Sequence, residues 1–324
     1  MKFPRRQFLH LAAGAAALPA IPRIAWSQAY PSRPVRIVVP FPPGQATDAV
    51  ARLISQSLSE RMGQAFVIEN RPGAGGNIAT ETVVRAQPDG HTLLLVGQAT
   101  AIFAAFLYKN LNYDFIRDIV PVANLGGGSY VMTLNPAVPA RTVPEFIAYT
   151  KANPDKINMG SSGTGSASHV FGELFKMTTG VNLVHIPYRG GYVPDLLSGQ
   201  VQIVFASVPS SLEHIRSGQL RALAVTGATR SEELPDIPTI GEVVSGYNAR
   251  VWYGIGAPRN TPADVIESLN KAINATLADT TVKARLAKLG VDPMPMSAPE
   301  FGKYIVGETE KWANVIKFAG IKPE

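Results

Sequence analysis

The 324-residue sequence contains no cysteine. Disulfide bonds, thiolate catalysis and Cys-ligated metal centres are therefore excluded, and so is a lipid anchor on a cysteine. Charged residues are scarce, at 17% of the chain, and the five histidines show no spacing typical of a metal site. Neither a phosphate-binding Gly-x-x-x-x-Gly-Lys loop nor a Gly-x-Gly-x-x-Gly dinucleotide motif occurs. We therefore expect neither a metal nor a cofactor.

The first 29 residues have the pattern of a cleavable export signal. A basic stretch ending in Arg5 and Arg6 precedes an apolar run from Phe8 to Ala20. The small residues Ser27 and Ala29 follow at the positions that a signal peptidase recognises. Because the apolar run is too short to span a bilayer, we predict cleavage after Ala29 and a periplasmic mature chain. The two adjacent arginines leave open whether the general or the twin-arginine route exports it.

Removal of this segment changes the charge balance of the chain. The full sequence has 30 basic and 24 acidic residues, and the four charged residues within 1–29 are all basic. The mature chain then has 26 basic and 24 acidic residues and a net charge of +2. Such a nearly neutral chain lacks the basic excess typical of polyanion binding, so we expect no nucleic-acid partner. Its 295 residues suffice for about two domains.

Short β-rich runs alternate with amphipathic helical stretches along the mature chain. This pattern is typical of α/β domains with largely parallel sheets. We predict strands at residues 35–39, 65–69, 92–96, 157–159, 183–186, 201–205 and 220–225. We also predict a helix capped by Thr47 or Asp48, and further helices at about 167–177, 262–277, 282–289 and 299–318.

No flexible linker divides the mature chain into two halves. We therefore expect two interleaved lobes, with the chain crossing between them near 122–124 and 221–226. In this prediction residues 30–122 and 226–324 form lobe I, residues 123–225 form lobe II, and residues 1–29 are the signal peptide.

Four loops rich in glycine and small polar residues follow predicted strands: Pro43–Asp48, Gly73–Asn77, Ser161–Ser166 and Pro187–Gly191. A helix N-terminus offers unpaired N–H groups and a partial positive charge, so it binds carboxylates without a dedicated cation. Because α/β sheets bind ligands beyond the carboxyl ends of their strands, four such loops favour a binding site for a small acid. Ordinary turns have a similar composition, however.

Two residues in these loops have simpler explanations as well. Asp48 is equally explained as a helix cap, and His169 as a buried polar group with partners inside the protein.

Several sequence blocks, in the same order along the chain, resemble the receptors of the tripartite tricarboxylate transporters, the Bug family. The similarity extends from about Tyr30 to the C-terminus. It implies an α/β periplasmic-binding-protein fold of two lobes, with a hinge and a ligand cleft between them. It also implies integral-membrane transporter subunits as partners, and we expect a monomer. The blocks are Pro40–Gly44 with Asp48, Glu69–Ala79, Pro88–Gly90, Ser161–Ser166 with His169, His185–Gly190, Leu197–Val201, Leu220–Thr226 and Pro235–Thr239.

The resemblance also implies where the ligand binds. In such receptors the first loop and the Ser/Gly loop hold a ligand carboxylate from opposite lobes, partly through water. Of the implied residues, we predict that Asp48 mainly shapes its loop, while Ser162 and Thr164 contact the ligand. Carried over to this sequence, the site comprises Gly44, Gln45, Ala46, Asp48, Ser162, Thr164, His169, Arg189, Gly190, Gly191 and Ser207.

This sequence departs from the family pattern at two places. Gln45 stands where a second glycine is expected, and Ala206-Ser207 stands where Asp-Asn is frequent. Loss of that acid removes a partner for a ligand ammonium group, so amino acids are disfavoured. Dicarboxylates, tricarboxylates and aromatic carboxylates all remain open as ligands.

The main alternative is an exported hydrolase with Ser162 and His169 as nucleophile and base. A nucleophile elbow requires Gly-x-Ser-x-Gly, and the sequence around Ser162 lacks the final glycine. Ser268 and Lys271 match Ser-x-x-Lys, but they lie in a predicted amphipathic helix without supporting motifs. A structural or adhesive protein would not require such glycine-lined loops. We therefore expect a binding protein and not an enzyme.

Overall fold

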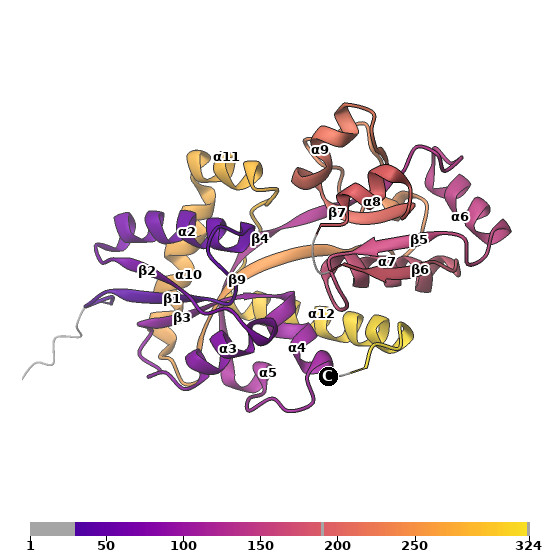
Figure 1. Cartoon of the computed structure of the whole chain (residues 1–324). Coiled ribbons are helices and arrows are strands. Elements are labelled where there is room, and N and C mark those ends of the chain that lie inside the picture. Colours follow the sequence, from indigo (N-terminus) through magenta and orange to yellow (C-terminus); the bar gives the residue numbers. More distant parts are fainter. Residues whose placement is uncertain (1–29, 189–190, 323–324) are drawn as a thin grey trace, which may run out of the picture. The chain divides into compact units, whose positions relative to one another are not determined.

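The computed structural model describes residues 30–188 and 191–322, and from Pro31 onward the chain forms one compact unit (Figure 1). The predicted signal peptide and its cleavage site lie outside the described residues. Among the helices that are described, none has the length and apolar character needed to cross a membrane.

A first group of strands pairs around β1. β1 pairs in parallel with β2 and β3, and β9 pairs antiparallel with β3 on one side and β4 on the other. Helices α2 and α11 lie on one side of this part of the sheet, and α3 and α5 lie on the other (Figure 1). The strands are β1 (Val35–Val39), β2 (Phe66–Asn70), β3 (Thr92–Gly97), β4 (Ile119–Leu134) and β9 (Arg250–Pro258).

A second group of strands pairs around β5 and the far end of β4. β5 pairs in parallel with β6 and β7, and β4 pairs antiparallel with β7 and β8. The sheet is therefore mixed and not largely parallel as expected, because β4 and β9 run antiparallel to their neighbours. The strands are β5 (Asn158–Ser161), β6 (Val184–Pro187), β7 (Ile203–Ser207) and β8 (Arg221–Val225).

β4 belongs to both groups of strands. Its first part, up to Ser129, pairs with β9, and the part from Tyr130 to Leu134 pairs with β7 and β8. This strand contains Pro121 and the glycines 126–128, which are typical of loops, so the sequence pattern did not predict it. The division into two lobes at the boundaries given above stays a prediction.

The seven predicted strands are all present, with bounds that shift by at most two residues. The predicted start of the first helix was wrong. α2 begins at Ala46 with Gln45 as its N-cap, so Thr47 and Asp48 lie inside its first turn. The helices are α2 (Ala46–Met62), α3 (Asn77–Val84), α4 (Ala104–Leu107), α5 (Phe115–Asp118), α6 (Val143–Ala152), α7 (Ala167–Thr179), α8 (Val193–Ser198), α9 (Val208–Arg216), α10 (Ala263–Ala278), α11 (Thr280–Lys288) and α12 (Ala298–Phe318).

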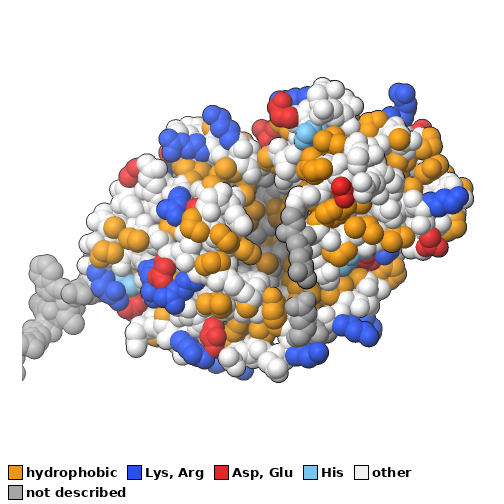
Figure 2. Space-filling model, in the orientation of Figure 1, with side chains coloured by type: hydrophobic (Ala, Val, Ile, Leu, Met, Phe, Trp, Pro, Cys, Tyr) orange, Lys and Arg blue, Asp and Glu red, His pale blue; other side chains and the backbone are white. Residues whose placement is uncertain are grey.

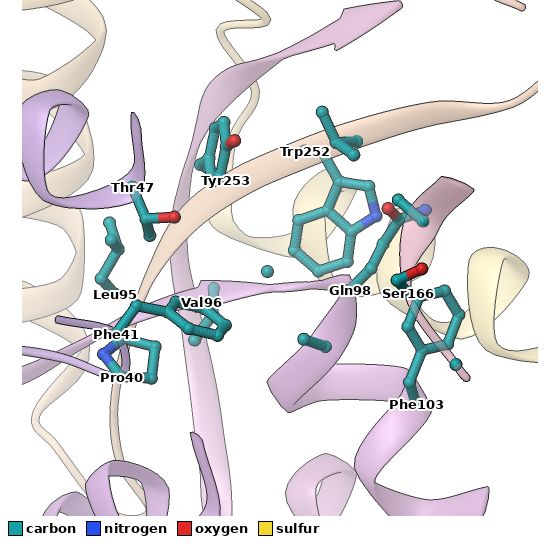
Figure 3. A pocket seen from close by; sticks show the side chains of 15 residues that line it. Pro40, Phe41, Thr47, Leu95, Val96, Gln98, Phe103, Ser166, Trp252 and Tyr253 are labelled. Carbon is teal, nitrogen blue, oxygen red and sulfur yellow. The ribbon is translucent and has the colours of Figure 1, made fainter. Parts of the chain in front are cut away.

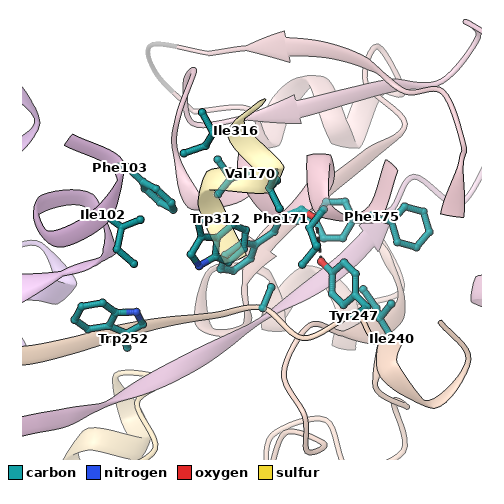
Figure 4. Close-up of a cluster of buried hydrophobic side chains, with 14 of the residues drawn as sticks. Ile102, Phe103, Val170, Phe171, Phe175, Ile240, Tyr247, Trp252, Trp312 and Ile316 are labelled. Carbon is teal, nitrogen blue, oxygen red and sulfur yellow. Dashed lines mark hydrogen bonds between the residues drawn. The ribbon is translucent and has the colours of Figure 1, made fainter. Parts of the chain in front are cut away.

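One hydrophobic core extends across both groups of strands. It includes Leu94 from β3 and Phe205 from β7, both fully buried. At its centre Trp312 of α12 stacks on Phe171 of α7, with ring centroids 5.3 Å apart. The same indole meets Phe103 edge-on at 5.9 Å (Figure 4). The last helix therefore packs against elements of both groups.

Charged side chains are dispersed over the surface that Figure 2 displays. Lys and Arg alternate there with Asp and Glu and do not gather in one patch. This distribution agrees with the near-neutral charge of the chain after residue 29.

Candidate functional site

The main candidate site is a cavity of about 170 Å³ (Figure 3). A cavity of roughly 150 Å³ is enough to hold benzene, so this one has room for a small organic molecule. Its walls come from the loop after β1 and the first turn of α2, the end of β3 and the short π-helix η2 (Ala99–Phe103) that follows it, the start of α7, and β9. The lining residues are Pro40, Phe41, Thr47, Leu95, Val96, Gly97, Gln98, Ala99, Phe103, Gly165, Ser166, Ala167, Val251, Trp252 and Tyr253.

The walls of the cavity are mainly apolar. Rings of Phe41, Phe103, Trp252 and Tyr253 contribute to them, and none of the lining residues within the described chain carries a charge. Ligand sites of this type bind the body of a molecule through apolar contacts and orient it through a few polar groups. The polar groups available here are hydroxyls, one amide, one indole N–H and backbone groups.

The loop that precedes α2 is shaped by Asp48. Its carboxylate accepts hydrogen bonds from the Gly44 N–H at 3.0 Å, Arg52 Nε at 2.9 Å and Asn70 Nδ2 at 2.9 Å. The bond from Arg52, with those from Gly44 and Asn70, lowers the pKa of Asp48 to about 2, although burial of the carboxylate opposes this shift. All these partners belong to the protein, so Asp48 holds the loop in place while its neighbour Thr47 lines the cavity.

The loop before α7 folds around its own polar side chains. Ser166 is the N-cap of α7, where its Oγ accepts from the His169 N–H and donates to the Gly163 carbonyl at 2.7 Å. His169 Nδ1 accepts from the Gly165 N–H at 3.0 Å. Ser162 and Thr164 are exposed at the tip of the loop. Gly165 and Ser166 line the cavity, and His169 is buried beneath them.

His169 belongs to an interior cluster with His185, Glu173 and Lys176. The two imidazole rings stack with centroids 3.6 Å apart, and His169 Nε2 lies 3.6 Å from a Glu173 oxygen. Burial, reinforced by the neighbouring His169, lowers the pKa of His185 to about 4. His169 thus has the partners within the protein that the simpler explanation required.

The residues of the alternative hydrolase do not meet. Ser162 Oγ pairs with Ser168 Oγ at 3.2 Å, and His169 Nδ1 is occupied by the Gly165 N–H. A different pair, Ser161 Oγ and His185 Nε2, lies 2.6 Å apart. Ser161 is fully buried, however, so this pair stabilises the loop and is not open to a substrate.

None of the predicted site residues that the structure describes lines the cavity. Gly44, Gln45 and Ala46 are exposed before and at the start of α2. Gly191 is exposed, and Ser207 pairs with Ser210 at 2.8 Å. Arg189 and Gly190 lie outside the described residues. Contact of all these residues with a ligand stays a prediction.

Sequence reasoning missed Gln98, Trp252 and Tyr253. Trp252 and Tyr253 lie on β9, which the pattern did not predict. Gln98 follows β3 directly, and the rule that ligands bind beyond the carboxyl ends of strands could have indicated it.

Comparison with known proteins identifies the family. The profile of the tripartite tricarboxylate transporter family receptors matches residues 50–321. Protein BugT of Bordetella pertussis is 36% identical over 299 residues, which cover 90% of this chain and 91% of BugT.

Solved structures agree with this assignment. The structure of Rpa4515 from R. palustris with adipate is 35% identical, with a TM-score of 0.77, and the match covers 91% of this chain and all of that chain. MatC from Rhodopseudomonas palustris with bound malate is 31% identical, with a TM-score of 0.72, over 89% of this chain and all of that one.

The architecture is thus the α/β fold of periplasmic binding proteins, as the resemblance implied. The matched family consists of receptors and not of enzymes, which agrees with the absence of an accessible Ser–His pair among the described residues. This chain belongs to the receptor family of the tripartite tricarboxylate transporters, the Bug family of solute-binding proteins.

Proposed function

We propose that this chain is exported, captures a small organic carboxylate in the cavity, and delivers it as a monomer to the membrane subunits of a tripartite tricarboxylate-type transporter. The observation that carries the proposal is that two helix N-termini border one cavity. Thr47 in the first turn of α2 and Ser166 at the N-cap of α7 both line it. The related proteins bound to adipate and malate make a carboxylate the natural ligand class.

Helix N-termini explain why no cation is required. The first N–H groups of a helix have no acceptor four residues earlier and carry a partial positive charge. A carboxylate placed between α2 and α7 would receive such donors from both helices, with hydroxyls of Thr47 and Ser166 nearby. Within an otherwise apolar cavity each of these bonds is stronger than in water.

We also propose that the loop residues predicted from the sequence contact the ligand when it is bound. Gly44–Asp48 and Ser162–His169 approach the ligand from two sides, and neither loop alone can surround a small acid. Ligand binding would then favour a closed form in which both loops contact it, because only that form offers the full set of donors. The membrane subunits would recognise this closed form.

Isothermal titration calorimetry on residues 30–324 with a panel of carboxylates tests capture. We expect saturable binding of at least one acid, which is recovered unchanged. If no acid binds, or if the bound acid is consumed, the proposal is wrong.

Small-angle scattering with and without the acid so identified tests closure. We expect a smaller radius of gyration at saturation, with a scattering mass that corresponds to one chain. An unchanged radius would contradict closure while leaving capture intact. Sequencing of the N-terminus from periplasmic material tests export, where an intact Met1 would contradict it.

A further inference from the structure

Two polar atoms of the cavity wall have no partner within the described chain. They are the indole nitrogen Nε1 of Trp252 and the amide oxygen Oε1 of Gln98. Both side chains are deeply buried, with 1% and 4% of the residue exposed. Buried polar groups in folded proteins almost always find a hydrogen-bond partner, so a pair of unpartnered atoms in one ligand cavity requires an explanation.

The orientation of the Gln98 amide is set by α12. Its Nε2 donates to Glu308 Oε2 at 3.3 Å. Glu308 also accepts from Trp312 Nε1 at 2.9 Å and forms an ion pair with Lys311. An ionised carboxylate only accepts hydrogen bonds, so the amide must direct its NH₂ group to Glu308. The oxygen is then the atom of the amide that remains without a partner in the described chain.

Trp252 supplies a hydrogen-bond donor that complements the oxygen of Gln98. An indole nitrogen only donates, and this one has no acceptor within the described chain. In the view of Figure 3 the nitrogen edge of Trp252 is turned toward the end of the Gln98 side chain. Within a cavity of about 170 Å³, one small ligand would reach both residues. Two residues of the cavity lining thus hold one buried donor and one buried acceptor without partners in the described chain.

We propose, on the basis of the proposed function, that the preferred ligand is a flat, largely apolar monocarboxylate that carries a hydroxyl group. The carboxylate binds at the N-termini of α2 and α7, and aromatic walls contact the body. The hydroxyl accepts from Trp252 Nε1–H and donates to Gln98 Oε1. A hydroxyl does both, whereas a second carboxylate only accepts.

A second carboxylate would also be disfavoured by its charge. It would face the Gln98 oxygen, and none of the described lining residues offers a cation to pair with it. A methyl or hydrogen in place of the hydroxyl would leave both protein atoms unpartnered. The cavity should therefore distinguish a hydroxylated aromatic acid from a plain aromatic acid and from an aliphatic diacid.

Calorimetry on residues 30–324 with benzoate, 3-hydroxybenzoate, 4-hydroxybenzoate and adipate tests this inference. We expect at least one hydroxybenzoate to bind roughly tenfold or more tightly than benzoate, since two hydrogen bonds are gained. Adipate should bind more weakly than that isomer. This comparison uses the unaltered chain, so it does not depend on how a variant folds.

Two substitutions assign the effect to the two atoms. Gln98→Met removes the acceptor and Trp252→Phe removes the donor, and both retain apolar bulk. Each should reduce the ratio of hydroxybenzoate affinity to benzoate affinity by about tenfold. Gln56→Met is the matched control, because Gln56 also donates to a glutamate, Glu60 at 3.3 Å, but is exposed on α2 and distant from the cavity lining.

The outcomes separate the two proposals. If no carboxylate binds, the proposed function itself fails. If carboxylates bind but neither hydroxybenzoate exceeds benzoate, or adipate binds most tightly, the inference is overturned while capture of a carboxylate stands. An unchanged ratio of hydroxybenzoate affinity to benzoate affinity in Gln98→Met and Trp252→Phe would also contradict it, because the two atoms would then not act on the hydroxyl.

Discussion

The carboxylate of Asp48 accepts three hydrogen bonds from within the protein, and only 3% of the residue is exposed. Two of these bonds tie α2 to the loop before it and to Asn70 at the end of β2. At the residue scale, the loop before α2 borders the cavity, and its shape depends on Asp48, whose side chain is not part of the lining.

Replacing this residue should affect stability more than binding. We expect Asp48→Ala to lower the free energy of unfolding by roughly 1–3 kcal/mol, because Gly44 and Asn70 lose a buried acceptor. Thr164→Ala is the comparison, since Thr164 is exposed; it should leave the melting temperature unchanged and weaken ligand binding. Thermal denaturation and calorimetry check both. The division of roles is contradicted if the two variants exchange these effects.

His185 should make stability depend on pH in a defined window. Its pKa falls from 6.5 in the unfolded chain to about 4 in the fold, so the unfolded chain binds the proton more readily. The contribution of the neutral His185 ring to the free energy of unfolding is complete above pH 6.5 and is lost as the pH falls toward 4. The loss is up to roughly 3 kcal/mol, and less where solvent screens the half-buried ring.

Urea denaturation between pH 4.5 and 7 measures this dependence. The variant His185→Phe retains a ring to stack on His169 but does not titrate, so its stability curve should be flatter in this window. His214→Phe alters a histidine on α9, outside this cluster, and should retain the slope of the original chain. Equal slopes in all three proteins would contradict the assignment to His185.

The loop residues near the cavity could be predicted from the sequence, but the residues of its wall could not. Gly44 and Gly165 lie in loops whose composition signals a strand-to-helix turn. Gln98 and Trp252 are single polar side chains in apolar surroundings, and their importance depends on which atoms the fold leaves without partners. That property is tertiary and has no sequence pattern.

At the scale of elements, β4 owes its course to three consecutive glycines. A side chain on Gly126 would meet the carbonyl of Asp292, one on Gly127 the carbonyl of Val251, and one on Gly128 the carbonyl of Gly290. Backbone from β9 and from the segment after α11 therefore lies directly against this stretch, just before β4 changes partners.

A methyl group added at Gly128 should destabilise the fold. We expect Gly128→Ala to lower the free energy of unfolding by roughly 1–3 kcal/mol, because the opposing atoms are backbone and cannot rotate away. Gly307→Ala is the matched control on the exposed side of α12, where no atom lies within 4 Å of the added carbon. This substitution should raise the free energy of unfolding by about 0.5–1 kcal/mol. Chemical denaturation measures both, and equal effects would refute the packing argument.

Several elements with a clear pattern were predicted well, whereas strands β4 and β9 and helix α9 were missed. β1 and β3 are mainly apolar runs, and α10 and α12 have a regular apolar face. β4 and β9 contain proline and glycine, which local propensity assigns to loops. Their strand conformation comes from pairing with each other over most of their length, and pairing between distant segments is not a local signal.

At the scale of the whole molecule, the core is continuous across both groups of strands. Buried residues of α7 and α12 pack together, with Trp312 between Phe103 and Phe171. Loss of packing in one group would therefore remove contacts from the other. The interleaved path of the chain was inferred from the absence of a linker, but a shared core between the groups was not.

We expect residues 30–324 to unfold in one cooperative transition. Scanning calorimetry should give a calorimetric enthalpy equal to the van't Hoff enthalpy, as for a single folding unit. A saturating ligand should raise the midpoint of this one transition as its concentration increases. Two separate transitions, of which the ligand moves only one, would show that the groups of strands fold independently.

The placement of the tryptophans gives the molecule an optical property. Trp26 lies within the predicted signal peptide, outside the described residues, and residues 30–324 contain only Trp252 and Trp312. Trp252 forms part of the cavity wall, whereas Trp312 is buried in the core with its nitrogen bonded to Glu308. Indole emission depends on the polarity and hydrogen bonding around the ring, so a ligand that enters the cavity should change the emission of Trp252 directly. It should change the emission of Trp312 only through shared neighbours such as Glu308, which Gln98 also contacts. Intrinsic fluorescence should therefore report occupancy of the cavity without a label.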